Sequence, residues 1–232
     1  NVFVVAPGVD LQTFYPGAGK AAARAKLNIA PDAIMITFVG RIQPHKGPDV
    51  LLRAAAEMIS HSPYLRAKLA VVIMGGASGS VNELEKLKTL TKFLKIEDVT
   101  HFVDPVSREL LPDWYRASDL VCVPSYSESF GLVALEAQAC GTPVVATAIG
   151  GLRTAVSDGI SGSLVDGHDP KAWSAVISRL LAEPARRLLL SMGAVEHASH
   201  FGWENTARKT LDVYDWALSK QTKSKLRLAG DA

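Results

Sequence analysis

The chain has 232 residues, of which 48% are hydrophobic and 21% charged, and its formal net charge is +2. This length favours one large domain, and this composition excludes wholesale disorder. A charge this small, on lysines and arginines that are scattered along the chain, argues against a nucleic-acid-binding surface.

The cysteines and the apolar segments bear on the cellular compartment. Cys122 lies in an apolar run and Cys140 at the end of a helical pattern, and neither has a partner at zinc-ligand spacing. Both are therefore expected to be buried free thiols of a reducing compartment. No apolar stretch reaches the roughly 18 residues of a membrane span. We predict a soluble, cytoplasmic protein without membrane association and, because a strand-like run opens the chain without an initiator Met, a piece of a longer one.

Short apolar, β-branched runs alternate with helical patterns along the chain. The predicted strands are residues 2–6, 34–39, 69–74, 99–103, 120–123, 144–146 and 162–165. The predicted helices are residues 49–60, 80–94, 109–117, 131–139, 151–156, 170–181, 184–199 and 203–218. This alternation predicts an α/β fold: a doubly wound, mainly parallel, Rossmann-like sheet with helices on both faces.

The loop after the predicted strand 34–39 carries two cations next to a helix start. In a doubly wound sheet, ligands bind outside the carboxyl ends of the strands. Arg41 and Lys46 follow Gly40 in this loop, and an anion there would meet both charges and the helix N-terminal amides. Solvated loop charges are the alternative, but the position of the loop favours binding of a diphosphate.

Two further strand-to-helix loops give weaker signals. The small residues from Gly75 to Ser80 would let a ligand approach the backbone, although such loops are as often only tight turns. After the strand 99–103, the backbone around Ser107 and the Arg108 guanidinium would suit the edge of a nucleotide base. Ser107 is equally well explained as a helix N-cap.

The most informative loop is Glu128-Ser129-Phe130-Gly131, which is followed by Glu136 with seven residues between the two glutamates. The amides at the helix start suit a diphosphate, and Glu136 suits the ribose hydroxyls of a nucleoside. Glu128 is then left for a sugar. Taken alone, either glutamate would be read as a cap or a surface charge. Their placement together with the two cations favours a nucleotide-sugar site.

Metal and hydrolase sites find no support in the sequence. The histidines show no arrangement with carboxylates or cysteines that is typical of metal ligands, and the nucleophile elbow and the Walker-type phosphate loop are both absent.

Taken together, these motifs resemble the C-terminal half of retaining glycosyltransferases of the GT-B type, family 4. The resemblance covers almost the whole chain and rests on Gly40-Arg41 to Lys46-Gly47, Ser118-Asp119 to Val123-Pro124-Ser125, Glu128-Ser129-Phe130-Gly131 to Glu136-Ala137, and Gly141-Thr142-Pro143-Val144-Val145-Ala146. It implies that this lobe binds the nucleotide-sugar donor, whereas an N-terminal lobe absent from this chain supplies most of the acceptor site. The isolated lobe is then expected to be inactive.

The resemblance also implies roles for single residues. Arg41 and Lys46 would bind the donor diphosphate and, with Glu128 at the sugar, form the catalytic set. The resemblance also assigns the ribose to Glu136. Together with the loop residues considered above, the predicted nucleotide-binding set is Gly40, Gly75, Arg108, Ser129, Phe130, Gly131 and Glu136. Retention of configuration without a protein nucleophile, and a diphosphate bound without a metal or other cofactor, are further implications.

Within the family, the segments 38–44, 48–54 and 135–141 are similar to the subgroup that transfers N-acetylglucosamine from UDP-GlcNAc to inositol phosphate in mycothiol biosynthesis. His45 and Gly47 depart from that subgroup, which keeps sucrose-phosphate-type and mannosyl transferases as alternatives. A non-catalytic nucleotide-sugar-binding module and a nucleotide-sugar epimerase share the fold and also stay open. The epimerase would need further acidic residues at the sugar.

The expected organisation is a donor-binding domain over residues 1–200, a crossover helix over 201–219 that returns toward the N-terminal lobe, and a flexible basic tail over 220–232. The oligomeric state is left open.

Overall fold

A parallel six-stranded sheet forms the centre of the computed structural model, which describes residues 2–76 and 82–230. The strand order is β3-β2-β1-β4-β5-β6, and every neighbouring pair is parallel. The strands are β1 (Ile34–Val39), β2 (Leu69–Met74), β3 (Thr100–Val103), β4 (Leu120–Val123), β5 (Val144–Thr147) and β6 (Gly162–Val165). The predicted α/β fold is confirmed.

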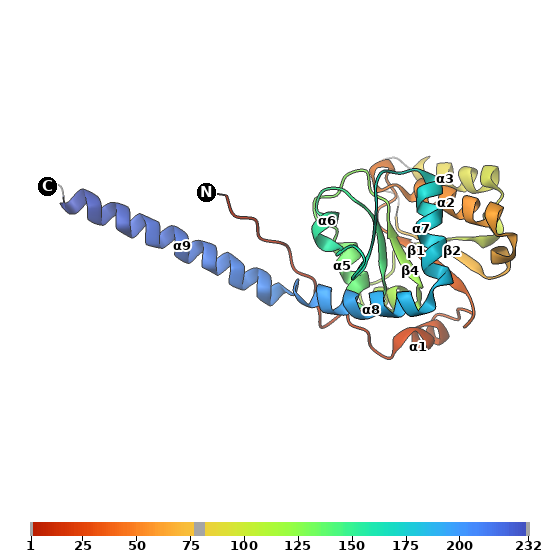
Figure 1. Cartoon of the computed structure of the whole chain (residues 1–232), viewed down its shortest axis with the longest axis horizontal. Coiled ribbons are helices and arrows are strands. Elements are labelled where there is room, and N and C mark those ends of the chain that lie inside the picture. Colours follow the sequence, from red (N-terminus) through yellow and green to blue (C-terminus); the bar gives the residue numbers. More distant parts are fainter. Residues whose placement is uncertain (1, 77–81, 231–232) are drawn as a thin grey trace.

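Nine α-helices are found in the part of the chain that the structure describes (Figure 1). They are α1 (Gly19–Lys26), α2 (Pro48–His61), α3 (Asn82–Leu94), α4 (Leu111–Ala117), α5 (Leu132–Ala139), α6 (Leu152–Ala155), α7 (Pro170–Ala182), α8 (Pro184–Ser199) and α9 (Trp203–Gly230). Short 3-10 turns lie at Pro44–Lys46, Pro63–Ala67 and Glu97–Val99.

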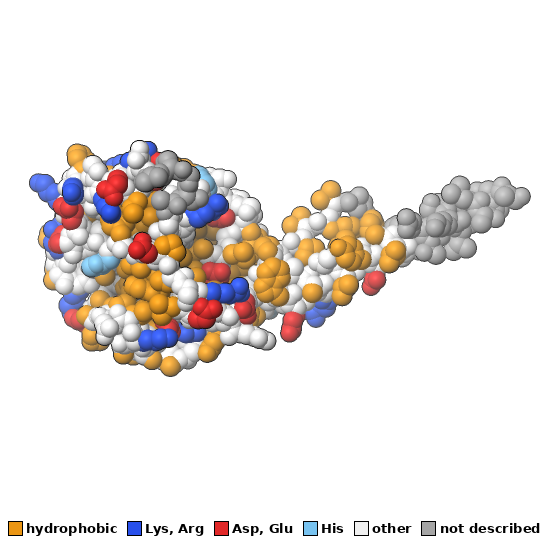
Figure 2. All heavy atoms as spheres, turned by 180° about the vertical axis from the view of Figure 1, so that it is seen from behind, with side chains coloured by type: hydrophobic (Ala, Val, Ile, Leu, Met, Phe, Trp, Pro, Cys, Tyr) orange, Lys and Arg blue, Asp and Glu red, His pale blue; other side chains and the backbone are white. Residues whose placement is uncertain are grey.

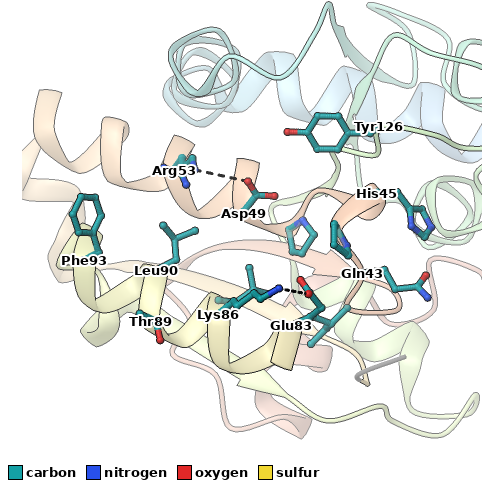
Figure 3. A pocket seen from close by; sticks show the side chains of 14 residues that line it. Gln43, His45, Asp49, Arg53, Glu83, Lys86, Thr89, Leu90, Phe93 and Tyr126 are labelled. Atoms are coloured by element: carbon teal, nitrogen blue, oxygen red, sulfur yellow. Dashed lines mark hydrogen bonds and ion pairs between the residues drawn. The ribbon is translucent and has the colours of Figure 1, made fainter. Parts of the chain in front are cut away.

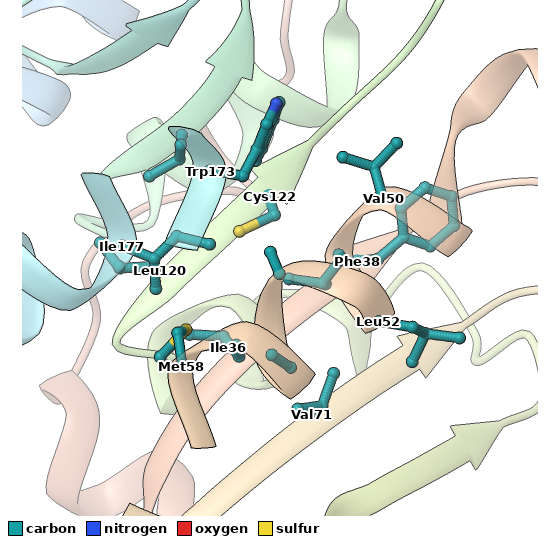
Figure 4. Packing of buried hydrophobic residues seen from close by; sticks show 14 of the residues in the cluster. Ile36, Phe38, Val50, Leu52, Met58, Val71, Leu120, Cys122, Trp173 and Ile177 are labelled. Carbon is teal, nitrogen blue, oxygen red and sulfur yellow. The ribbon is translucent and has the colours of Figure 1, made fainter. Parts of the chain in front are cut away.

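Side chains of the central strands alternate between two buried clusters, as the period of two in a strand requires. In β4, Leu120 and Cys122 join the core under α2 and α7, whereas Val121 and Val123 join the core under α5. Figure 4 shows the first of these clusters, in which strand residues meet Trp173 of α7. Because both faces are covered, the strands are apolar throughout, which is why the sequence revealed them clearly.

The direction of the strand order reverses between β1 and β4. From β1 the chain winds outward to β2 and β3, and it then returns to β4 and winds the other way to β6. Such a reversal opens a crevice between the loops that follow the two central strands. The loops after β1 and β4 are the two that carry the predicted cations and glutamates, so the topology places them side by side.

The sequence analysis did not predict helix α1. Polar contacts, which give no apolar periodicity in the sequence, hold this helix in place. Its Arg24 is buried and donates to the Asp119 carboxylate at 2.9 Å, and Lys20 pairs with the same carboxylate at 2.6 Å. The Asp119 side chain also accepts from the Met35 N–H at 2.8 Å. One carboxylate therefore joins α1 to the amino ends of β1 and β4. A search for apolar periodicity does not detect such an attachment.

The strand predicted over residues 2–6 is wrong. This segment is extended but pairs with no strand in the described part of the chain, and Val2 and Val4 are 93% and 92% exposed. It runs beside α9, where the Phe3 ring contacts the Trp216 ring edge-on at 4.8 Å and Thr206 donates to the Ala6 carbonyl. The prediction rested on β-branched composition alone, and no strand within the described ranges pairs with this segment.

Helix α9 leaves the globular part on the same side as the N-terminal segment (Figure 1). It begins at Trp203, as predicted, and continues to Gly230, through most of the segment predicted as a flexible tail. Figure 2 shows hydrophobic side chains along this projecting arm. Leu211, Tyr214 and Leu218 of α9 are each about 60% exposed. None of the helices within residues 2–76 and 82–230 combines the length and the apolar character of a membrane span.

Candidate nucleotide-sugar site

The loops after β1 and β4 meet through an ion pair between two predicted site residues. The Lys46 ammonium lies 2.7 Å from the Glu128 carboxylate, and both side chains are largely buried, with 19% and 15% exposed. Gly47 makes this approach feasible, since a Cβ there would lie 2.1 Å from the Pro124 carbonyl oxygen. Residues that are 82 positions apart in the sequence thus form one pair at the carboxyl edge.

The turns after β1 and β2 are in equally close contact. A Cβ on Gly75 would lie 1.8 Å from the Gly40 carbonyl oxygen, and the φ of Gly75 is +153°. Only glycine fits at such a position. A neighbouring loop of the same chain therefore requires glycine at Gly75, and the predicted approach of a ligand there stays a prediction.

A hollow of about 340 Å³ opens beside these turns, and its walls are mainly apolar. It is bordered by Arg41 from the β1 loop, Gly76 from the β2 loop, and Pro105 and Val106 from the β3 loop. The exposed Arg41 guanidinium has no ion-pair partner within residues 2–76 and 82–230. The arrangement offers a mainly apolar space for a base next to a cation that is available for a phosphate.

The start of α5 presents backbone N–H groups to the same edge. Gly131 caps the helix with a φ of +100°, and in the described chain no carbonyl or side chain accepts from the N–H groups of residues 129–131. Gly151 supports the loop from behind, because its N–H donates to the Glu128 carbonyl and a Cβ there would lie 2.3 Å from the Phe130 Cα. These amides are a candidate anion-binding group, next in sequence to the Glu128 that pairs with Lys46.

Glu136 lies in the second turn of α5 and is half-buried. Its Oε2 accepts a hydrogen bond from the buried Tyr115 hydroxyl at 2.8 Å. Burial raises the pKa of Glu136, while the Tyr115 hydrogen bond and the positive charge of Arg108 oppose that rise. Burial also raises the pKa of Tyr115 well above its ordinary value, and the neighbouring Glu136 charge adds to this rise, so its hydroxyl remains a donor.

Arg108 faces a partner that the sequence analysis did not anticipate. Its guanidinium pairs with Asp10 at 3.0 Å and lies over the Phe14 ring, and the side chain is 60% exposed. Asp10 also accepts from the Thr13 hydroxyl, which is the main reason why its pKa is lowered. The role of Arg108 at a nucleotide base therefore stays a prediction. In the structure, Arg108 links the segment around Asp10 to the loop after β3.

His168 is a further residue of this edge that the sequence analysis missed. It follows β6, and its ring stacks on Tyr126 with the centroids 3.7 Å apart and the planes at 15°. Its Nε2 lies 3.1 Å from the Ser125 carbonyl oxygen. The loop after β6 thus supports the loop that carries Glu128. The position of His168 just after the carboxyl end of a strand was the signal that could have identified this residue.

A larger hollow of about 800 Å³ lies between α2 and α3, on the other side of the β1 loop (Figure 3). Leu90 and Phe93 of α3 face it, and its charged residues pair within their own helices, Arg53 with Asp49 at 3.8 Å and Lys86 with Glu83 at 2.6 Å. These pairs leave the groove without an unbalanced charge for a diphosphate. The smaller hollow beside Arg41 is therefore the better candidate for a nucleotide site, despite its size.

Metal ligands do not gather at this edge. Across residues 2–76 and 82–230, no three side chains of histidine, cysteine, aspartate or glutamate lie together as a group that could hold a metal ion. Cys122 and Cys140 are buried free thiols, and burial raises the pKa of each to about 12.

Comparison with known proteins finds a family match over most of the chain. Residues 19–194 match the family of Glycosyl transferases group 1. Among curated relatives, D-inositol 3-phosphate glycosyltransferase 2 from Catenulispora acidiphila is 56% identical over 215 residues, which are 92% of this chain and 50% of the relative. The chain therefore spans about half the length of the curated relatives that it matches.

Solved structures share the fold over most of the chain. Sucrose-phosphate synthase from Thermosynechococcus elongatus is 33% identical with a TM-score of 0.83, over 94% of this chain and 53% of that one. The C-terminal domain of a group 1 glycosyl transferase, LpcC from Francisella tularensis, is 26% identical with a TM-score of 0.73, over 83% and 97% of the two chains.

A third structure, HepE from Anabaena in complex with UDP-glucose, is 23% identical with a TM-score of 0.81, over 92% of this chain and 57% of that one. At that identity the likeness concerns the fold alone. The family match covers the sheet and every loop of the candidate site, and the chain belongs to the group 1 glycosyl transferases.

Proposed function

We propose that this chain is the donor-binding, C-terminal half of a glycosyltransferase that moves a sugar from a UDP-sugar to a hydroxyl group of an acceptor. The Lys46–Glu128 ion pair beside the free amides of α5 carries the proposal. A nucleotide sugar has an anionic diphosphate attached to a neutral sugar rich in hydroxyls. The pair and the amides offer a cation, N–H donors and a carboxylate for these groups.

The positive groups would act on the leaving group. When the bond between the anomeric carbon and the diphosphate oxygen breaks, negative charge develops on that oxygen. Lys46, Arg41 and the amides of residues 129–131 are placed to stabilise this charge, and fixed donors of this kind are effective where charge develops in a transition state. The acceptor oxygen forms the new bond to the anomeric carbon, and its proton leaves with the phosphate. We propose retention of configuration, and no metal requirement on the diphosphate.

UDP is the donor nucleotide that we favour, and inositol phosphate the acceptor. HepE, which shares this fold, binds UDP-glucose, and the hollow beside Arg41 has room for a base. The acceptor follows from the relatives named D-inositol 3-phosphate glycosyltransferases. UDP-GlcNAc as donor, and a cytoplasmic location, complete the proposal. The acceptor site would require the half of the relatives that this chain does not cover.

Titration calorimetry with UDP tests the proposal on the chain itself. Lys46→Ala removes a charged donor and is expected to weaken UDP binding by about tenfold or more. Lys92→Ala is the matched control, because Lys92 is an exposed lysine of α3 away from the site. A chelator is expected to leave UDP affinity within about twofold.

Two results would count against the donor-binding function. One is the absence of both UDP and GDP binding by the unmodified chain. The other is equal UDP binding by the Lys46→Ala and Lys92→Ala variants. Sugar transfer should appear only when the missing half is supplied, so transfer by this chain alone would contradict the assignment of the acceptor site to that half.

A further inference from the structure

Tyr115 is held at a fixed position between the two helices that frame the nucleotide site. Its side chain is fully buried within the core formed by α4 and α5. The ring lies against Phe14, with the centroids 6.0 Å apart, and its own carbonyl oxygen accepts from the Thr142 hydroxyl at 2.6 Å. Both the ring and its backbone are therefore fixed, and the phenolic hydroxyl has a defined direction.

That hydroxyl contacts one oxygen of a predicted ligand-binding carboxylate. It donates to Glu136 Oε2 at 2.8 Å, whereas the other oxygen of Glu136 receives no hydrogen bond from residues 2–76 and 82–230. An ionised carboxylate accepts at both oxygens. One side of Glu136 is thus held by the protein, and the other side is available to a ligand.

The hydroxyl does more than fill space in the core. A phenylalanine would occupy nearly the same volume without the cost of burying a polar group, and a buried hydroxyl is tolerated only when it is hydrogen-bonded. The positive charge of Arg108 lowers the pKa of Glu136, but the guanidinium itself contacts Asp10 at 3.0 Å. Tyr115 is consequently the direct contact that sets the orientation of the Glu136 carboxylate.

We propose that Tyr115 is a positioning residue, which holds the Glu136 carboxylate in the orientation that accepts hydrogen bonds from both ribose hydroxyls of the donor nucleotide. The inference rests on the proposed function, because it needs a nucleotide in the site. It assigns to a core residue a part in selecting ribonucleotides. Selectivity arises because a site built to bind hydroxyls is left with an unpaired carboxylate when the ligand lacks them.

The test compares two ligands on two proteins by titration calorimetry. The ligands are UDP and 2′,3′-dideoxyuridine diphosphate, and the proteins are the unmodified chain and Tyr115→Phe. The unmodified chain is expected to prefer UDP, and the variant to lose about tenfold in UDP affinity but less than about twofold for the dideoxy ligand. Tyr64→Phe, at a tyrosine that is 78% exposed, is the matched control and should change neither affinity.

The outcomes separate this inference from the proposed function. Equal losses for both ligands in Tyr115→Phe would mean a purely structural role and would overturn the inference, while UDP binding would still support the function. No UDP binding by the unmodified chain would overturn both. If Tyr115→Phe does not fold, as judged by its thermal transition, a crystal structure of the unmodified chain with UDP decides. Tyr115 and ribose must then both lie within about 3 Å of the Glu136 carboxylate.

Discussion

Each edge of the sheet places a carboxylate against lysine or arginine, but the two carboxylates differ in how many of their oxygens have a partner. At the amino edge, Asp119 accepts from Lys20, Arg24 and a backbone N–H, and both oxygens are engaged. At the carboxyl edge, Glu128 pairs with Lys46 and lies 3.4 Å from the Ser125 hydroxyl through the same oxygen, Oε2. The first carboxylate is saturated by the protein, whereas the second has one oxygen without a partner among the residues that the structure describes.

This difference separates a structural ion pair from one that a ligand can enter. A buried charge with every partner in place is costly to disturb, because its removal leaves the opposite charge uncompensated. A pair with unused acceptor capacity, at the mouth of a crevice, can exchange partners when a diphosphate arrives. The contrast predicts that substitutions at the amino edge change stability and that those at the carboxyl edge change binding.

The largest expected effect is that of Asp119→Ala. Although burial opposes it, the charge and hydrogen bond of Lys20, with the Met35 N–H and Arg24, hold the pKa of Asp119 below its ordinary value. Its loss leaves the buried Arg24 guanidinium without its carboxylate, and the free energy of unfolding should fall by about 3–5 kcal/mol. Urea denaturation measures this change.

Asp32→Ala is the matched control, since Asp32 pairs with Lys68 on the surface and its removal should leave the free energy of unfolding nearly unchanged. The folded fraction of Asp119→Ala should still bind UDP with unchanged affinity. A loss of UDP affinity in folded Asp119→Ala would contradict the prediction that substitutions at the amino edge change stability alone.

A smaller effect, a gain in UDP affinity, is expected for Glu128→Gln. The change removes a carboxylate that repels the diphosphate and competes for Lys46, so UDP should bind about threefold tighter. The unmodified chain is expected to bind UDP-GlcNAc more tightly than UDP, and the variant to lose this preference, because the amide replaces the proposed sugar acceptor. Calorimetry with the two ligands measures both changes.

Glu85→Gln provides the control, at an exposed glutamate that pairs with Lys88. Weaker UDP binding by Glu128→Gln would mean that the ion pair is needed to shape the site, and Glu128 would then resemble Asp119 in function.

The sequence predicted the parts of this contrast that depend on apolar pattern and loop position. The strands β1 and β4 were recognisable because they are buried on both faces, and the loops that follow them had to meet at the carboxyl edge. The Lys46–Glu128 contact follows from that topology. Glycine at Gly47 and Gly75 was visible as composition, but the close approach of loops that requires it was not.

The rest depends on contacts that no periodicity encodes. Helix α1 is attached through Arg24 and Asp119, so its mostly small and charged residues gave no signal. Tyr115 occupies a core position where the sequence cannot distinguish a packed ring from a hydrogen-bond donor, and Arg108 turns toward Asp10 across a separation of 98 residues. Polar contacts between distant segments are therefore the part that required a structure.

The smallest expected effect concerns stability at the carboxyl edge and depends on pH. Burial raises the pKa of Glu136 in the folded chain, although Tyr115 of α4 and Arg108 of the β3–α4 loop oppose the rise. Cys140, at the end of α5, also lies near Glu136, but its pKa of about 12, raised chiefly by burial, keeps its thiol neutral. A raised folded pKa means that the contribution of Glu136 to stability is complete below the ordinary glutamate pKa. That contribution is lost as the pH rises through the folded pKa.

Glu136→Gln should therefore unfold at a higher temperature than the unmodified chain at neutral pH, and the difference should vanish at a pH below the ordinary glutamate value. The same variant should bind UDP more weakly at neutral pH, because the amide accepts fewer hydrogen bonds from ribose. Thermal unfolding at several pH values, with the exposed Glu97→Gln as control, measures the first effect, and calorimetry the second. Stability gained and binding lost at one residue would identify Glu136 as a carboxylate kept ionised for a ligand. A variant that is instead less stable at neutral pH, by a difference that shrinks as the pH falls, would place Glu136 with Asp119 among the structural carboxylates.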